Sequence, residues 1–203
     1  MTETISSNGA LVRVGALAAI SAGGLRVIGA LIPADEQSIG LAMLYLITDI
    51  GITLGLIAWY LAQRAAVGAW GSAGFAVGIV GVLIIRSNGA IPGVALYPPG
   101  ALLVAVGIGV LAYCAWRARR LPLWVLALLV CSALAGIVGS LVPELGALFV
   151  LAGVMFGSGF AGVGAVVWHE SVVRRTPSRA PHPDAVSTCS ERVRGTSSRR
   201  ERL

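Results

Sequence analysis

The sequence predicts an all-α fold: a polytopic membrane protein with a bundle of six transmembrane helices and a disordered basic C-terminal tail. Hydrophobic residues make up 57% of the 203 positions, charged residues make up only 12%, and the mean hydropathy is +0.87. A helix needs about 20 apolar residues to cross ~30 Å of hydrocarbon. Runs of about that length recur from residue 10 to residue 168, separated by short polar segments.

Six apolar runs define the predicted spans: 10–32, 39–62, 68–86, 99–116, 121–141 and 145–168. The connection at 87–98 contains two prolines, which remove backbone donors and disrupt helices. We therefore expect this segment to be the longest loop, either outside the membrane or dipping back into it. The domain organisation is then an N-terminus at 1–9, a transmembrane domain at 10–170 and a tail at 171–203.

The first run has an alternative interpretation as a secretory signal peptide, because Arg13 precedes a stretch of small residues. The apolar run continues past Arg26 to Ile32, however, and is longer than the core of a typical signal peptide. We therefore expect an uncleaved first span.

The orientation follows from the distribution of arginine, which supplies all 15 basic residues. If six helices alternate in direction, one side receives Arg13, Arg64, the arginines of 117–120 and the tail. The other side receives Arg86 and three carboxylates in loops. The positive-inside rule then puts both termini in the cytoplasm. The absence of lysine beside 27 glycines is typical of GC-rich coding, so we expect the inner (cell) membrane of a bacterium.

The tail at 171–203 is polar, lacks aromatic residues and carries eight arginines against three acidic residues. Such a segment cannot bury enough apolar surface to offset the entropy lost on ordering, so it is predicted to be disordered. Its simplest interpretation is a topology signal with a solvated end. The functional alternative is attraction to anionic lipid headgroups, at about 1 kcal/mol per basic residue near the surface. A docking arm for another protein is a further possibility, and no nucleic acid is expected as a partner.

Two charged residues lie inside predicted spans. Asp49 is about ten residues into the second span, and Arg26 is about six residues from the outer end of the first. A lone charge there costs about 2.5–3.5 kcal/mol, so neither side chain should face lipid. Because a short turn joins the two helices, the sequence predicts a buried ion pair between Arg26 and Asp49.

Asp49 shares one helical stripe with Tyr45 and Thr53, which predicts a polar seam along the second span. Intramembrane carboxylates often mark proton or solute paths, so this seam is a candidate route for transport. The alternative is a structural ion pair that fixes the packing of two helices.

Glycines recur at spacings of three and four in several spans, as in Gly71, Gly74, Gly78 and Gly81. Small residues allow close backbone contact between helices in lipid. We expect these glycine faces to pack within the chain, with a homo-oligomer through one of them as the alternative.

No enzymatic activity is expected. The two histidines lie outside the six runs, so an intramembrane serine protease would lack its base. The three cysteines and two histidines have no metal-ligand spacing, and no glycine-rich segment has the setting of a phosphate loop. We therefore expect no metal and no cofactor. The sequence favours a non-enzymatic accessory or packing partner in the membrane, with a small transporter or proton-coupled carrier that uses Asp49 as the alternative.

Overall fold

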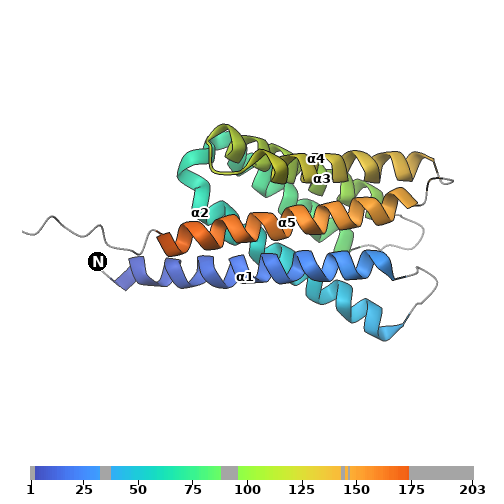
Figure 1. The fold of residues 1–203 in the computed structure, drawn as a ribbon, viewed down its shortest axis with the longest axis horizontal. Coiled ribbons are helices and arrows are strands. Elements are labelled where there is room, and N and C mark those ends of the chain that lie inside the picture. The colour runs from blue at the N-terminus through green and yellow to red at the C-terminus, as the bar shows by residue number, and fades with distance from the viewer. Residues whose placement is uncertain (1–2, 33–37, 88–95, 143–144, 146, 174–203) are drawn as a thin grey trace, which may run out of the picture. The chain divides into compact units, whose positions relative to one another are not determined.

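The computed structural model describes residues 3–32, 38–87, 96–142, 145 and 147–173. The chain divides into two units, Met1–Ser171 and Val172–Leu203. Within the described residues the fold is all-α, with five helices (Figure 1). They are α1 (Glu3–Leu31), α2 (Ile39–Arg86), α3 (Tyr97–Arg117), α4 (Leu123–Leu141) and α5 (Ala147–Val173).

Helix α2 turns back on itself at Gly68, the one residue inside it with non-helical torsions (φ 64°, ψ −163°). A positive φ is easily adopted by glycine, which lacks a Cβ. The Tyr60 hydroxyl lies 3.1 Å from the Ser72 hydroxyl, and the Tyr60 ring stacks on Phe75 with ring centroids 4.4 Å apart. Such contacts join the arm before Gly68 to the arm after it. Helix α2 is therefore a helical hairpin.

Four described helices are long and apolar enough to cross a membrane: Gly9–Leu31 of α1, all of α2, α3 and α5. The prediction of six separate spanning helices is therefore corrected to five helices with four candidate spans. One difference arises because the runs at 39–62 and 68–86 form the single helix α2, which continues through Gln63 and Arg64 to Gly68. The other arises because the apolar part of α4, Leu123–Gly139, is shorter than a typical span. The chain is nevertheless a polytopic membrane protein in contact with the lipid bilayer.

Helices that follow one another pack side by side in opposite directions, and α5 returns to lie along α1 (Figure 1). The buried core contains residues from all five helices, including Ala19 of α1, Trp59 of α2, Leu111 of α3, Val125 of α4 and Phe160 of α5. Large apolar side chains such as Leu17, Ile47 and Leu134 stay exposed. An apolar exterior around a packed interior is what a lipid environment requires.

Glycine brings the helix backbones into direct contact at two places. Between α1 and α5, a Cβ added to Gly23 would meet the carbonyl oxygen of Gly157 and lie 2.7 Å from the backbone nitrogen of Ala161. Between α2 and α3, Gly74, Gly78 and Gly107 pack in the same way. The predicted glycine face of Gly71, Gly74, Gly78 and Gly81 is thus buried within the chain. The homo-oligomer through a glycine face stays a prediction.

Two predicted segments fall largely outside the described residues. Of the loop at 87–98, only Ser87 and the residues from Leu96 onward are described, and α3 already begins at Tyr97. Helix α5 continues to Val173, three residues into the predicted tail, and positions 174–203 are not described. The predicted re-entrant loop and disordered tail remain predictions.

Replacement of Gly107 by alanine should destabilise the fold, because the new Cβ would lie 2.6 Å from the Gly74 carbonyl oxygen and force α2 and α3 apart. Overpacking of this kind costs about 1–3 kcal/mol. The matched control is Gly109→Ala on the same helix, where nothing lies within 4 Å of an added Cβ. Thermal unfolding of the purified protein in detergent should show a lower Tm for Gly107→Ala only. Equal Tm values for the two variants would contradict glycine-mediated packing.

Candidate functional site

The candidate site is an ion pair between the two arms of α2. The Arg86 guanidinium forms a salt bridge with the Asp49 carboxylate and also donates a hydrogen bond of 2.9 Å to the Tyr45 carbonyl oxygen. The side chains of Arg86 and Asp49 keep 38% and 26% of their exposure, so the pair lies at the side of the bundle and not in its centre. Arg86 therefore neutralises Asp49, the charge within the second predicted span.

The turn at Gly68 explains why Asp49 meets Arg86. In an antiparallel hairpin the position numbers of facing residues add up to a nearly constant value, and Tyr60 faces Ser72 and Phe75. The same register places Asp49 opposite the last turn of the second arm, where Arg86 ends the helix. From the sequence alone, Arg86 is predicted to end an apolar run on the outer side of the membrane. Asp49 and Arg86 lie at almost equal distances along the chain from Gly68, and this spacing is the signal in the sequence that could have predicted their pairing.

The predicted partner of Asp49, Arg26 of α1, makes a different contact. Its guanidinium carbon lies 5.8 Å from the centre of the Tyr45 ring, a cation–π arrangement. Tyr45 donates its hydroxyl to the Gly29 carbonyl oxygen on α1 at 3.1 Å. The predicted Arg26–Asp49 pair is thus replaced by Arg86–Asp49, with Tyr45 between the two arginines. On α2 it is the Tyr45 ring that Arg26 contacts.

The threonines of this arm bond within their own helix, and the predicted polar seam stays a prediction. Thr53 donates its hydroxyl to the Asp49 carbonyl oxygen at 2.8 Å, and Thr48 donates to the Leu44 carbonyl oxygen at 2.7 Å. These hydroxyls satisfy carbonyls one turn earlier in their own helix, a common arrangement for threonine in apolar surroundings. Tyr45 contacts both arginines, and the hydroxyl of Thr53 is bonded to the backbone carbonyl of Asp49.

A second polar cluster lies at the opposite end of the bundle, where Gly68 turns the chain. Trp59 donates its indole N–H to the Gln63 side-chain oxygen at 3.1 Å, and Gln63 donates to the Arg120 carbonyl oxygen at 3.4 Å. The Arg120 guanidinium lies 3.8 Å from the Glu170 carboxylate on α5. The sequence did not predict this cluster, which joins α2, the α3–α4 turn and α5.

The chemistry available to these clusters is ion pairing and hydrogen bonding. Within the described residues, no three side chains of the metal-binding types His, Cys, Asp and Glu lie together. The described part of the chain buries Ser132, whose hydroxyl donates to the Ala152 carbonyl oxygen on α5 at 2.9 Å. This polar group, like the threonines, is used to satisfy a backbone carbonyl.

The fold and these clusters define a class, a polytopic α-helical membrane protein in which Asp49 and Arg86 pair across a helical hairpin. Comparison with protein-family models, with curated proteins and with solved structures finds no match for this chain.

Breaking the ion pair should destabilise the protein, because it leaves a lone charge inside a span. We expect Asp49→Ala and Arg86→Ala each to lower the free energy of unfolding by about 2 kcal/mol. Arg26→Ala should cost only about 0.5–1 kcal/mol, the value of a cation–π contact near a surface. Unfolding of the detergent-solubilised protein by denaturant, followed by circular dichroism, measures all three.

The control is a pair of double variants. The double variant Asp49→Leu with Arg86→Leu removes both paired charges and should recover most of the lost stability. The double variant Arg26→Leu with Asp49→Leu should not recover this stability, since Arg86 is left without its carboxylate. Recovery by the second double variant and not by the first would restore Arg26 as the partner of Asp49.

Proposed function

We propose that this protein is a non-enzymatic accessory or packing partner in the cytoplasmic membrane of a bacterium. The observation that carries the proposal is the Asp49–Arg86 ion pair, in which the intramembrane carboxylate is already neutralised by a residue of its own helix. A carboxylate held in this way fixes the packing of two helical arms.

Six membrane crossings are part of the proposal. If α2 were straight, its 48 residues would extend about 72 Å, more than twice the thickness of the hydrocarbon core. Its two antiparallel arms are instead each suited to one crossing. The apolar part of α4, Leu123–Gly139, is about 17 residues long, which is the lower limit for a span. Helix α4 also packs antiparallel to α5.

The proposed orientation rests on arginine. The turn near Arg64 and the turn at 117–120 lie at the same end, because Gln63 bonds to the Arg120 carbonyl oxygen. The C-terminal part of α5 lies at this same end, because Glu170 pairs with Arg120. By the positive-inside rule this basic end faces the cytoplasm, which puts both termini there and brings the arginine-rich tail close to anionic lipid headgroups.

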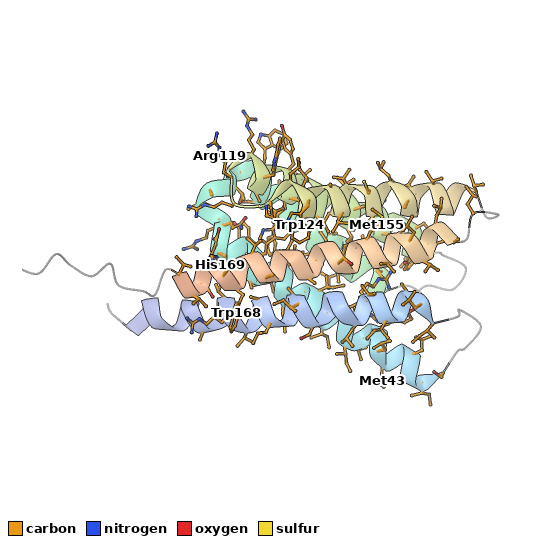
Figure 2. The ribbon with its side chains drawn as sticks, viewed as in Figure 1. Met43, Arg119, Trp124, Met155, Trp168 and His169 are labelled. Carbon is orange, nitrogen blue, oxygen red and sulfur yellow. The ribbon has the colours of Figure 1, made fainter. Side chains whose placement is uncertain are left out.

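An exposed apolar stripe on the first arm of α2 supports the role of packing partner. Met43, Ile47, Ile50 and Leu54 follow one another at helical spacing, and each keeps between 41% and 57% of its exposure. Met43 lies near the N-terminal end of this arm (Figure 2). Such a stripe suits contact with lipid chains or with a helix of another membrane protein.

A small transporter or proton-coupled carrier is the second candidate. The observation in its favour is that Asp49 keeps 26% of its exposure and that Tyr45 connects its partner Arg86 to a second cation, Arg26. In this reading Asp49 would release Arg86 when it takes up a proton.

Reporter fusions test the topology. Fusions after Arg64, Arg120 and Leu203 should report the cytoplasm, and fusions after Gln37 and Glu144 should report the outside, because arginine-rich turns are retained inside. Equal signals after Gln37 and Arg64 would show that the first arm of α2 does not cross the membrane.

The Asp49→Asn variant separates the two candidate functions. Asparagine can still accept a hydrogen bond from Arg86 but cannot carry a proton, so a structural pair predicts equal proton flux in liposomes with either protein. The measurement is a pH-sensitive dye inside liposomes under an imposed gradient, with empty liposomes as the control. Flux through the wild type that disappears in a folded Asp49→Asn variant would favour the carrier and overturn the accessory role.

A further inference from the structure

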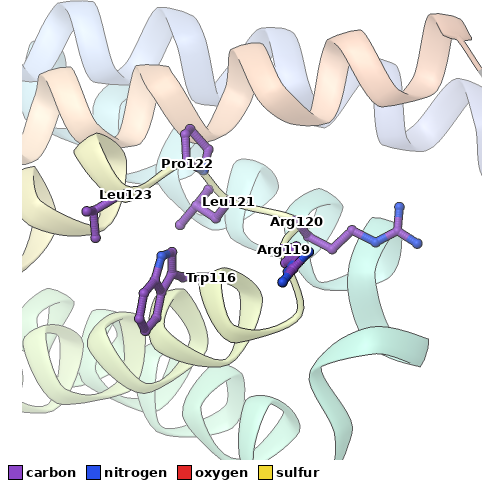
Figure 3. A pocket seen from close by; sticks show the side chains of 6 residues that line it. All are labelled: Trp116, Arg119, Arg120, Leu121, Pro122 and Leu123. Atoms are coloured by element: carbon purple, nitrogen blue, oxygen red, sulfur yellow. The ribbon is translucent and has the colours of Figure 1, made fainter.

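A shallow hollow of about 370 Å³ lies at the turn between α3 and α4 (Figure 3). This is the Gly68 end of the bundle, away from the Asp49–Arg86 pair. The hollow is lined by Trp116, Arg119, Arg120, Leu121, Pro122 and Leu123. Its lining therefore includes two arginines and a tryptophan beside apolar residues, and the Arg120 side chain extends away from Trp116 (Figure 3).

The backbone at this turn is unusual for the residue that occupies it. Helix α3 ends with the Arg119 N–H donating to the Trp116 carbonyl oxygen at 2.8 Å and the Arg120 N–H donating to the Ala115 carbonyl oxygen at 2.9 Å. This pair of bonds is a Schellman motif, which favours glycine at its left-handed position. Here that position is Arg119, with φ 56°. The fold thus accepts a less favourable backbone and gains a guanidinium beside the hollow.

The charges at the hollow are only partly compensated. Arg120 lies 3.8 Å from Glu170, and among the described residues neither of the two ion pairs includes Arg119. Helix α4 also begins here, and its N-cap residue Pro122 provides no side-chain hydrogen bond to the first N–H groups. The partial positive charge of that helix end adds to the arginines. The hollow is therefore complementary to an anion.

The apolar side of the hollow distinguishes a lipid from a soluble anion. Trp116 keeps 39% of its exposure and Leu123 keeps 61%, and both lie where a helix meets the membrane surface under the proposed topology. Tryptophan is enriched at the level of lipid headgroups. A free phosphate has no use for these apolar groups, but the glycerol and first methylenes of a phospholipid would contact them.

We propose that this hollow binds the headgroup phosphate of an anionic phospholipid of the cytoplasmic leaflet, with Arg119 as the principal cation and Trp116 beside the headgroup. The proposal rests on the membrane topology given above, and it describes a structured site that is separate from the arginine-rich tail. The tail would attract anionic lipid in general, whereas the hollow would retain one lipid at a defined place.

The test compares the full-length wild type with Arg119→Gly by native mass spectrometry in detergent. The variant removes the guanidinium and supplies the residue that the Schellman motif favours, so its Tm should not fall. Its affinity for the first phosphatidylglycerol should fall about fivefold, the effect of one basic residue near a lipid surface. Binding of phosphatidylcholine should change little.

The matched control is Arg64→Ala, which removes an exposed arginine at the same end of the bundle but outside the hollow. Both variants retain the tail, so a difference between them reports the hollow alone. Equal loss of phosphatidylglycerol in the two variants would overturn the proposal, and so would glycerol 3-phosphate competing as well as the lipid does. Lipid retention in detergent does not depend on orientation, so this test can fail while the reporter fusions still support the topology.

Discussion

Close backbone contact at glycine is the interaction on which this structure depends. In lipid there is no hydrophobic drive to bring helices together, and tight packing must supply the attraction. Gly23 and Gly157 bring α1 and α5 into contact, and Gly74, Gly78 and Gly107 do the same for α2 and α3. Side chains on the outside are left large and apolar, where they face lipid.

The polar contacts follow from that packing. Once the arms of α2 lie side by side, Arg86 reaches both the Asp49 carboxylate and the Tyr45 carbonyl oxygen. At the other end, Trp59, Gln63 and Arg120 connect in the same way across the α3–α4 turn. Each cluster satisfies groups that would otherwise be costly in hydrocarbon, and each joins segments distant in sequence. The two ends of the bundle are therefore fixed by polar contacts and the middle by glycine.

The two ends also differ in charge, which links the fold to the proposed role. The basic end carries Arg64, Arg117, Arg119 and Arg120, together with the hollow at the α3–α4 turn. The opposite end has the neutralised Asp49–Arg86 pair. Under the proposed topology, a protein built in this way presents cations to one membrane surface and an apolar exterior to lipid.

The sequence by itself determined the class of protein, the limits of most apolar helices and the glycine faces, because lengths of apolar runs and residue spacing are local properties. It also placed Asp49 and Arg26 inside spans. Only the tertiary structure decided that 39–62 and 68–86 form one hairpin helix and that Asp49 pairs with Arg86. The partner of a charge depends on the register of the hairpin, and that register is set by the turn at Gly68 and by the packing of Tyr45 against α1, neither of which an apolar pattern records.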